Sequence, residues 1–418
     1  MNSPPFLKGV SVWFGHLPGE WRLLRLRHAC SSVTDGSHFS PKPADEGFPY
    51  VTVRDLVGRV VAVDSAAKIS GDDFRRLERD GCRPRKGDVL FSKDGSVGKV
   101  VVVTRDDFVV LSSLAILSPQ PFVEPSFLAY CLESAPGLAQ LESGYAGAAL
   151  RRLTLDAIVD LHVPIPTFDV QASIAGFLDW KTAEIDALIA KKERLLRLLD
   201  EKRTALVSEV IANGARASNG AHERWRVLRN KVLFLEVDER TERSDEVLLT
   251  VSHITGVTKR SEKEVTMMEA ETTEGYKRCR AGDVAVNTMW AFMGAIGVSP
   301  HDGIVSPSYN VYRPRGQALI GTYYDLLCRT PSYVAQIGGL SKGIWRSRLR
   351  LYPDAFFELR TPVPSVKEQQ AIVERVSRMD AVDAPLRSTL ERSVRTLREY
   401  RSALITAAVT GQIEVPAW

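Results

Sequence analysis

The sequence predicts an α+β protein: two mixed α/β globular domains separated by two long helices, which pair as an antiparallel coiled coil with an internal pseudo-two-fold repeat. Three observations lead to this prediction. The 418 residues are enough for two or three domains. Two parts of the chain repeat one another, and each repeat ends in a long segment with apolar residues at helical spacing. The composition, 44% hydrophobic and 25% charged, allows an ordinary core to be buried.

The repeat has a constant offset of 198 residues over its best-preserved part. The segment LTLDAIVDLHVPIP, which ends at Pro166, matches LYPDAFFELRTPVP, which ends at Pro364. The same offset pairs Gln171 with Gln369. Upstream the match is looser, so each half is a variable block followed by a constant block. The alternative is a plain duplication that only builds a symmetric fold, but it does not explain why one block alone keeps its frame.

Each constant block opens with Pro-x-Pro, which disfavours helix, and continues as an apolar stripe near a period of 3.5 residues. A helix of about 40 residues is about 60 Å long and cannot bury such a stripe alone. We expect the two helices to pair with each other; the alternative is two unrelated surface helices. Pro385 should kink or break the second helix. The expected stripe residues are Ile174, Leu178, Ile185, Leu188, Leu195, Leu199, Leu206 and Val210, then Ile372, Val376, Met379, Leu386, Leu390, Val394, Leu397, Leu404 and Ala408.

The variable blocks indicate strands and loops, with single helices expected near Pro125–Gly137 and Leu319–Cys328. The segment VLFSKDGSVGKVVVV predicts a strand, a glycine turn and a strand, and VAVNTMWAFMGAIGVS is its counterpart. In this alignment Gly95 and Gly98 correspond to Gly294 and Gly297. A phosphate-binding loop is disfavoured because its first glycine is replaced by a lysine and no Ser or Thr follows Lys99.

No convincing catalytic or metal-binding constellation is present. The five cysteines are scattered without a CxxC pair, which argues against disulfides or structural zinc and favours a reducing cytoplasm. The seven histidines form no HxH or HxxxH pair. PDAFFELR faintly resembles a nuclease signature, but its acids are too close together, so we expect a structural role. No apolar stretch approaches the roughly 20 residues that span a membrane, and the start is unlike a secretory signal. We therefore expect a cytoplasmic, non-catalytic chain without cofactor or metal.

Basic residues are concentrated in short clusters although the formal net charge is only +4. The segment SKGIWRSRLR holds four basic residues and a tryptophan without an acid, and RRLERDGCRPRK is a second cluster. Solvated surface charge explains a single cluster, but Arg and Lys with aromatic residues at equivalent repeat positions favour DNA binding. The residues that we expect to face DNA are His38, Lys93, Ser96, Arg151, Arg152, Asn287, Trp290, Lys342, Arg346 and Arg348.

Four strings of the sequence, taken together, resemble the DNA-specificity (S) subunit of type I restriction–modification systems. They are TDGSHFSP, KGDVLFSKDGSVGK, VPSVKEQQAIV and LREYRSALITAAVTGQIEV. The resemblance extends over nearly the whole chain in the family's order of variable and constant blocks. One departure lies at the first junction, where Asp169 and Val170 precede Gln171 although the family usually has Glu directly before Gln.

The resemblance implies a non-catalytic, sequence-specific subunit that reads a bipartite target. Residues 1–170 and 215–367 would be target-recognition domains, residues 171–214 a spacer helix, and residues 368–418 a second spacer helix with a C-terminal tail. The implied partners are double-stranded DNA, two methyltransferase (M) subunits docked on the helices, and restriction (R) subunits reached through the complex. The alternative that stays open is a coiled-coil interaction scaffold with nonspecific DNA binding. A fused nucleotide-dependent nuclease is disfavoured by the missing phosphate loop and metal ligands.

Overall fold

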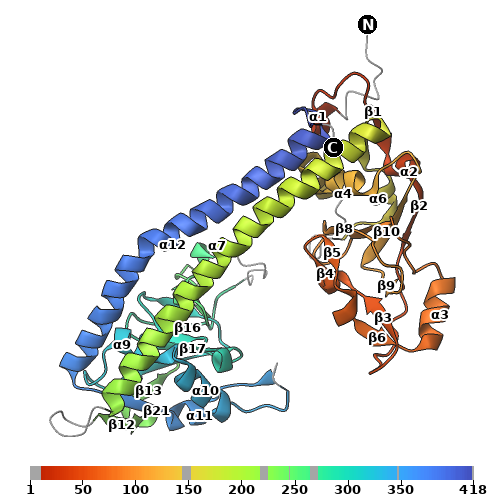
Figure 1. Ribbon diagram of the computed structural model, residues 1–418. Coiled ribbons are helices and arrows are strands. Elements are labelled where there is room, and N and C mark those ends of the chain that lie inside the picture. Colours follow the sequence, from red (N-terminus) through yellow and green to blue (C-terminus); the bar gives the residue numbers. More distant parts are fainter. Residues whose placement is uncertain are drawn as a thin grey trace. The chain divides into compact units, whose positions relative to one another are not determined.

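The computed structural model describes residues 11–143, 152–216, 225–243, 245–263, 272–345 and 348–416 (Figure 1). The chain divides into two compact units. Unit 1 comprises residues 1–192 and 392–418, whereas unit 2 comprises residues 193–391. Unit 1 therefore combines segments from both ends of the sequence, and unit 2 is formed by the middle of the chain.

Unit 1 is built on a four-stranded antiparallel sheet with the strand order β2-β10-β7-β8. Its strands are β2 (Cys30–Asp35), β10 (Leu114–Pro119), β7 (Val89–Ser92) and β8 (Val100–Val102). Three smaller sheets accompany it: β1 (Arg22–Arg25) with β11 (His162–Ile165); β6 (Ala67–Ile69), β3 (Phe48–Val51) and β9 (Val109–Val110); and β4 (Leu56–Val57) with β5 (Val60–Val61). The helices are α1 (Ser11–Phe14), α2 (Leu26–Ala29), α3 (Gly71–Arg79), α4 (Pro125–Glu133), α5 (Ala135–Ser143) and α6 (Leu155–Val159).

Unit 2 repeats this plan, with a four-stranded sheet in the equivalent order β13-β20-β17-β18. Its strands are β13 (Phe234–Val237), β20 (Tyr309–Pro314), β17 (Val284–Asn287) and β18 (Ile296–Val298). Two-stranded sheets join β12 (Arg226–Arg229) to β21 (Arg360–Val363), β14 (Leu249–Ser252) to β15 (Gly256–Lys259), and β16 (Lys277–Cys279) to β19 (Gly303–Val305). The helices are α8 (Asn230–Leu233), α9 (Gly321–Cys328), α10 (Pro331–Leu340) and α11 (Pro353–Glu358). The sequence repeat is thus a repeat of topology.

The predicted hairpins are confirmed, with one correction to their alignment. Strand β7 pairs with β8 and β17 pairs with β18, and both β7 and β17 are completely buried because they lie inside their sheets. The strand registers pair Gly98 with Gly294, not Gly95 with Gly294. Gly98 and Gly294 have φ angles of 94° and 95°, a region in which glycine is favoured, so the same turn conformation is kept in both units.

The two long helices are α7 (Phe168–Arg216) and α12 (Val366–Val409), and they pair antiparallel within each unit. In unit 2, Asp200 pairs with Arg387, and Arg203 pairs with Asp380 at 2.9 Å, so partner numbers fall as residue numbers rise. In unit 1, Asp186 lies 3.0 Å from Arg401, and the start of α7 shares a buried cluster with the end of α12. The predicted antiparallel pairing is confirmed. Pro385 lies inside α12, which continues through it without the break that we considered. No described helix is both long and apolar enough to cross a membrane.

The expected apolar stripe is only partly buried. Leu188, Leu195 and Leu386 are 43, 49 and 52% exposed, contrary to the prediction. Val207, Ile211 and Ile405, which the predicted stripe omitted, are buried. The reason is geometric, because one partner helix covers one side of a helix and leaves apolar residues on the flank in solvent.

A buried glutamine joins the globular part of each unit to its long helix. Gln171 donates from Nε2 to the carbonyl oxygens of Phe122 (3.0 Å) and Pro166 (2.9 Å), and its Oε1 accepts from the Glu124 N–H (2.9 Å). Gln369 makes the same three bonds, to the carbonyls of Ala318 and Pro364 (both 2.9 Å) and from the Ile320 N–H (2.7 Å). The first junction is therefore equivalent to the second at its glutamine, although the preceding glutamate is missing.

We expect Gln171→Ala and Gln369→Ala each to lower the free energy of unfolding by about 2–3 kcal/mol, because each leaves one buried and two part-buried backbone groups without their glutamine partner. Urea unfolding of the full chain measures the loss. Gln412→Ala, at an exposed position in the C-terminal segment, is the control and should change stability little. Equal effects at all three positions would show that the junction bonds do not stabilise the fold.

Candidate nucleic-acid interface

Segments far apart in the sequence meet at one end of the four-stranded sheet in unit 1. The Ser37 N–H donates to the Val110 carbonyl (2.8 Å), so the loop after β2 is fixed beside β9. The Leu153 N–H donates to the Lys93 carbonyl (2.9 Å), which fixes the segment before α6 beside the β7–β8 turn. This arrangement places side chains from three separate segments next to one another.

A row of alternating basic and acidic side chains connects these segments. Arg152 Nε lies 3.0 Å from Asp94, and Lys93 Nζ lies 3.3 Å from both Asp94 and Asp35. His38 Nε2 lies 3.2 Å from the same Asp35 carboxylate. The Lys93 side chain is only 3% exposed, whereas those of His38 and Arg152 are 67 and 60% exposed. Lys93 is therefore a buried support, and His38 and Arg152 are the groups that solvent and a ligand can reach.

Unit 2 has an equivalent surface with different side chains. The Leu351 N–H donates to the Thr288 carbonyl (3.2 Å), as Leu153 does to Lys93 in unit 1. Arg350 thus takes the place of Arg152, and the two backbone bonds that it exchanges with Lys342, both 2.9 Å, close a loop. Lys342 is exposed and pairs with Asp354, whose pKa it holds below the usual range.

A second buried lysine lies in unit 2 and was missed by sequence reasoning. Lys277 Nζ lies 3.1 Å from Asn310 Oδ1 and 3.8 Å from Asp238. Asp238 directly follows β13, at the position that Asp35 occupies in β2. Lys277 comes from β16, whereas Lys93 follows β7, so only the strand registers, and no sequence motif, indicate the equivalence.

The predicted DNA-facing residues fall into three groups. His38, Ser96, Arg152, Trp290, Lys342 and Arg348 are exposed. Lys93 and Asn287 are buried, which differs from the expectation. Asn287 donates from Nδ2 to Tyr309 Oη (3.0 Å) and accepts from the Met289 N–H (3.3 Å), so it stabilises a turn. Arg151 and Arg346 lie outside the described residues.

The cluster RRLERDGCRPRK lines a groove of about 860 Å³ in unit 1. Its lining includes Arg83, Arg85 and Lys86, the β2 residues Ser32 and Thr34, and the acids Glu78, Asp88 and Asp106. Arg83 is held by Glu78 and by the Asp106 carbonyl (2.6 Å). Basic and hydroxyl side chains are usual donors to phosphate oxygens, so the groove contains groups that can bind phosphate.

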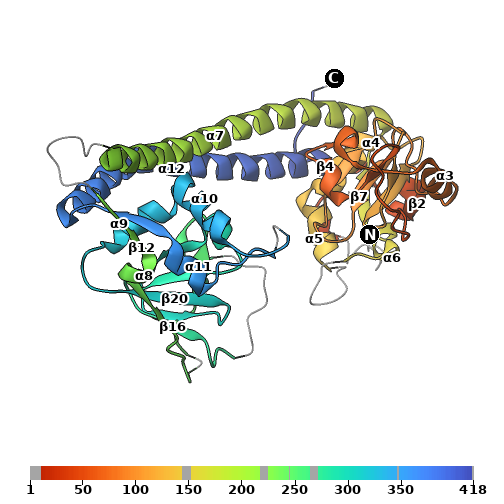
Figure 2. The same cartoon turned by 90° about the horizontal axis from the view of Figure 1, so that it is seen from below.

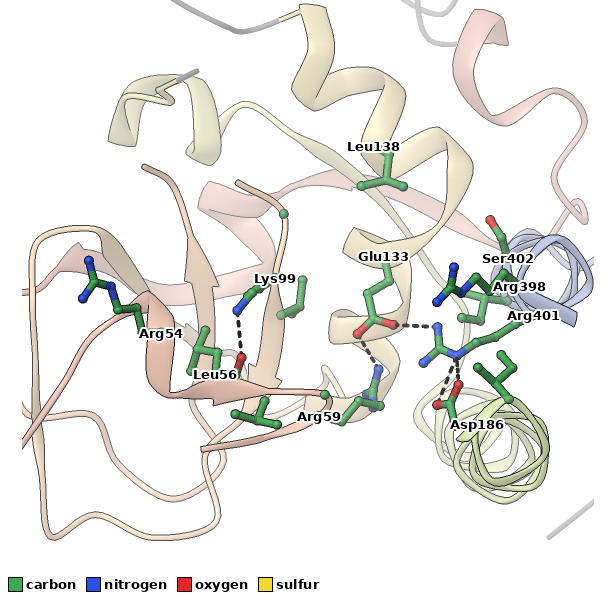
Figure 3. A pocket seen from close by; sticks show the side chains of 16 residues that line it. Arg54, Leu56, Arg59, Lys99, Glu133, Leu138, Asp186, Arg398, Arg401 and Ser402 are labelled. Atoms are coloured by element: carbon green, nitrogen blue, oxygen red, sulfur yellow. Dashed lines mark hydrogen bonds and ion pairs between the residues drawn. The ribbon is translucent and has the colours of Figure 1, made fainter. Parts of the chain in front are cut away.

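A further pocket, of about 770 Å³, lies in unit 1 where α4 approaches the two long helices (Figure 3). Glu133 is its centre, with its carboxylate 2.6 Å from Arg59 and 3.7 Å from Arg401, which also pairs with Asp186 (Figure 3). Burial raises the pKa of Glu133, and the two arginines oppose that shift. Lys99 donates to the Leu56 carbonyl (2.9 Å). Arg59, Arg401 and Lys99 thus already have partners inside the protein. The polar groups of the pocket connect the globular part of unit 1 to its helices.

The described residues hold no group of three or more His, Cys, Asp or Glu that could bind a metal ion. The five cysteines are free and buried. Burial raises the pKa of Cys82 to about 11 and that of Cys30 to about 12, so both remain thiols at neutral pH. What the sheet ends offer to a ligand is ion pairing and hydrogen bonding by their charged side chains.

Comparison with known proteins finds a family match within the first half of the chain. Residues 41–197 match the family described as Type I restriction modification DNA specificity domain. The specificity subunit of the type I restriction enzyme StySPI from Salmonella potsdam is 26% identical over 96 residues, or 23% of this chain. The aligned stretch spans 21% of that relative's length.

Solved structures resemble the chain over nearly its whole length. A chain from a study of complex assembly and conformational transition of the type I R-M system is 18% identical, with 95% of this chain and 100% of that chain covered and a TM-score of 0.52. The HsdS subunit from Thermoanaerobacter tengcongensis is 19% identical over 95% of this chain and 98% of its own, with a TM-score of 0.37. The first similarity shows that the fold, two sheet-rich domains and two long helices, is shared.

We expect Lys93→Met to lower the free energy of unfolding by about 3 kcal/mol, because it leaves two part-buried carboxylates, Asp35 and Asp94, without their common cation. Arg152→Met should cost less than about 1 kcal/mol, since the Arg152–Asp94 pair is largely exposed on the arginine side. Urea unfolding compares the two variants. A Lys93 variant as stable as the Arg152 variant would contradict the supporting role of Lys93.

Proposed function

We propose that this chain is the sequence-specific DNA-binding specificity subunit of a type I restriction–modification complex. Each unit would read one half of a bipartite target, with the target-recognition domains over residues 1–170 and 215–367 and spacer helices over 171–214 and 368–418. The observation that carries the proposal is the repeated sheet end, where the same backbone frame presents different exposed side chains in the two units. A chain of this kind has no catalytic role, and methylation and cleavage belong to its partners.

The exposed side chains at the sheet ends suit double-stranded DNA. Arginine and lysine neutralise phosphates, and arginine also bonds guanine bidentately in the major groove. Unit 1 offers Arg152 and His38, and unit 2 offers Lys342, Arg348 and Trp290. Because the two sets differ in charge and shape, the two half-targets should differ in sequence.

Exposed apolar residues on the long helices support docking of two methyltransferase subunits. Phe168 and Val366, which are related by the 198-residue offset, are 47 and 44% exposed. Leu188 and Leu386, related by the same offset, are 43 and 52% exposed. Apolar residues at equivalent exposed positions in both repeats favour two equivalent docking sites. Restriction subunits would join through the assembled complex, which would work in the cytoplasm.

A coiled-coil scaffold that binds DNA nonspecifically is the competing function. It would need the paired helices and the basic clusters, but not two different sets of side chains on one repeated frame. Binding to matched and scrambled duplexes at physiological salt separates the two functions, because a scaffold binds both equally.

The direct experiment maps methylated bases in cells that carry this chain together with its methyltransferase partner. The proposal expects methylation at a split motif, with two short specific parts separated by unspecified bases. The motif should disappear when the chain is deleted. Methylation that does not depend on the chain, or a single continuous motif, would contradict the bipartite reading.

Single arginine variants should affect one half of the motif each. We expect Arg152→Ala and Arg348→Ala to weaken binding to the mapped duplex roughly tenfold if each reads a base, because a bidentate contact discriminates bases by about that factor. Fluorescence anisotropy with duplexes mutated in either half measures the change. Arg152→Ala should relax specificity in one half only and Arg348→Ala in the other. Uniform weakening across all sequences would assign the residue to a phosphate.

Charged substitutions on the exposed helix faces should remove methyltransferase subunits one at a time. We expect Leu188→Lys and Leu386→Lys each to leave a complex with one such subunit, and the double variant to leave none, because a buried unpaired lysine is costly in an apolar contact. Native mass spectrometry of the co-expressed complex counts the subunits. Ala190→Lys and Ser388→Lys, exposed and related by the same offset, are matched controls. Complete complexes in all variants would place the docking surface elsewhere.

A further inference from the structure

The loop that follows α10 presents two large apolar side chains to solvent. Ile344 is 95% exposed, more than any other large apolar residue in the described part of the chain, and its neighbour Trp345 is 67% exposed. In both views this loop extends away from the body of unit 2 (Figures 1 and 2). Apolar side chains at a protruding point gain little from the fold itself, so their position calls for a ligand.

The base of this loop is held firmly. Lys342 and Arg350 exchange two backbone hydrogen bonds of 2.9 Å, and the Arg348 N–H donates to the Trp345 carbonyl (2.8 Å). Gly343 has a φ of 158°, and a Cβ at this position would lie 2.5 Å from the Arg348 carbonyl oxygen. The close approach therefore requires glycine. Leu351, which is fully buried, anchors the end of the loop in the core of unit 2.

The segment around the two apolar side chains is rich in cations, of which Lys342 pairs with Asp354 at the base of the loop. Residues 341–350 contain four basic residues and no acid, and Lys342, Arg348 and Arg350 are described members of this set. Cations beside an apolar point fit DNA, in which phosphates flank an apolar base stack. An apolar wedge can enter between two base pairs and kink the duplex while neighbouring Arg and Lys hold the backbone.

We propose that Ile344 and Trp345 form an apolar wedge that inserts between two neighbouring base pairs in the half-target read by unit 2. This inference rests on the proposed function and adds a second mode of recognition to it. Pyrimidine–purine steps unstack most easily, so a wedge selects such a step without a hydrogen bond to its bases. Unit 2 then reads part of its half-target through the deformability of the duplex.

The repeat makes the wedge specific to one half of the target. In the sequence, the 198-residue offset relates Ile344 and Trp345 to Ala146 and Gly147, which carry almost no apolar side chain, and the aromatic residue beside them is Tyr145. These residues of the first half lie outside the described part of the chain. The inference therefore predicts one kinked step per target, in the half bound by unit 2. Unit 1 serves as an internal control on the same DNA.

The experiment uses the full chain in complex with its methyltransferase subunits and the mapped duplex, with 2-aminopurine placed at successive positions. Fluorescence of this base rises when it is unstacked. We expect a several-fold rise at one step in the half-target of unit 2, which is the wedge signal. In both halves the bases that the methyltransferases flip out of the stack also give a rise, and this rise does not depend on Ile344 and Trp345. The double variant Ile344→Ala, Trp345→Ala should lose the wedge signal and bind roughly tenfold more weakly. The slope of log affinity against log salt should stay the same, because no cation is removed.

Controls separate the wedge from other roles. Val232→Ala removes an exposed apolar side chain elsewhere in unit 2 and should keep the signal. Thermal unfolding should be unchanged in the double variant, since both side chains are exposed. No wedge signal from the wild-type complex on its target, or a full wedge signal in the double variant, overturns the wedge. So does loss of methyltransferase subunits with an unchanged signal, which would make this loop a protein contact. Equal wild-type binding to matched and scrambled duplexes would instead overturn the proposed function.

Discussion

Each long helix in this protein needs a partner to cover its apolar stripe, and within each unit that partner is a segment of the other long helix. In unit 1 the start of α7 packs with the end of α12, and in unit 2 the end of α7 packs with the start of α12. The consequence is that residues 392–418 complete a unit that begins almost 400 residues earlier. The fit there is close, since a Cβ on Gly411 would lie 2.5 Å from Pro18. Unit 1 is therefore not a continuous piece of sequence, whereas unit 2 is.

Sequence patterns predicted the parts of the fold that depend on local periodicity. The valine-rich runs around a glycine turn predicted the β7–β8 hairpin, and the regular spacing of apolar residues predicted the long helices. The exposure of Leu188 and Leu386 could not be predicted, because it depends on which side of the helix the partner covers. The bonds of Gln171 and Gln369 were equally inaccessible, since the repeat showed that the residues correspond but not which carbonyl groups they meet.

In the candidate interface, too, features that follow from local sequence could be predicted, and features that depend on tertiary contacts could not. His38 and Arg152 were recognised from their residue type and neighbourhood, and the structure places both on the surface. Residue type also suggested Lys93, but its burial between Asp35 and Asp94 is a tertiary property. Lys277 and Glu133 carried no signal at all, because their partners lie on other elements. In both units a buried lysine meets an aspartate at the end of the same strand, so the charge arrangement is kept although the lysine comes from a different strand.

In the proposed function, the pairing of exposed cations with acids would also affect discrimination between DNA sequences. Arg152 lies against Asp94 and Lys342 against Asp354, so neither enters an encounter with DNA as an unopposed charge. Exposed ion pairs are weak, and a well-placed phosphate or base can replace the acid at small cost, whereas a poorly placed one gains little. Nonspecific DNA binding depends almost entirely on unopposed positive charge, so a net charge of +4 and the pairing of Arg152 and Lys342 would keep such binding weak. Specificity depends on the ratio between target and nonspecific affinity, and weak nonspecific binding raises that ratio without a tighter target complex.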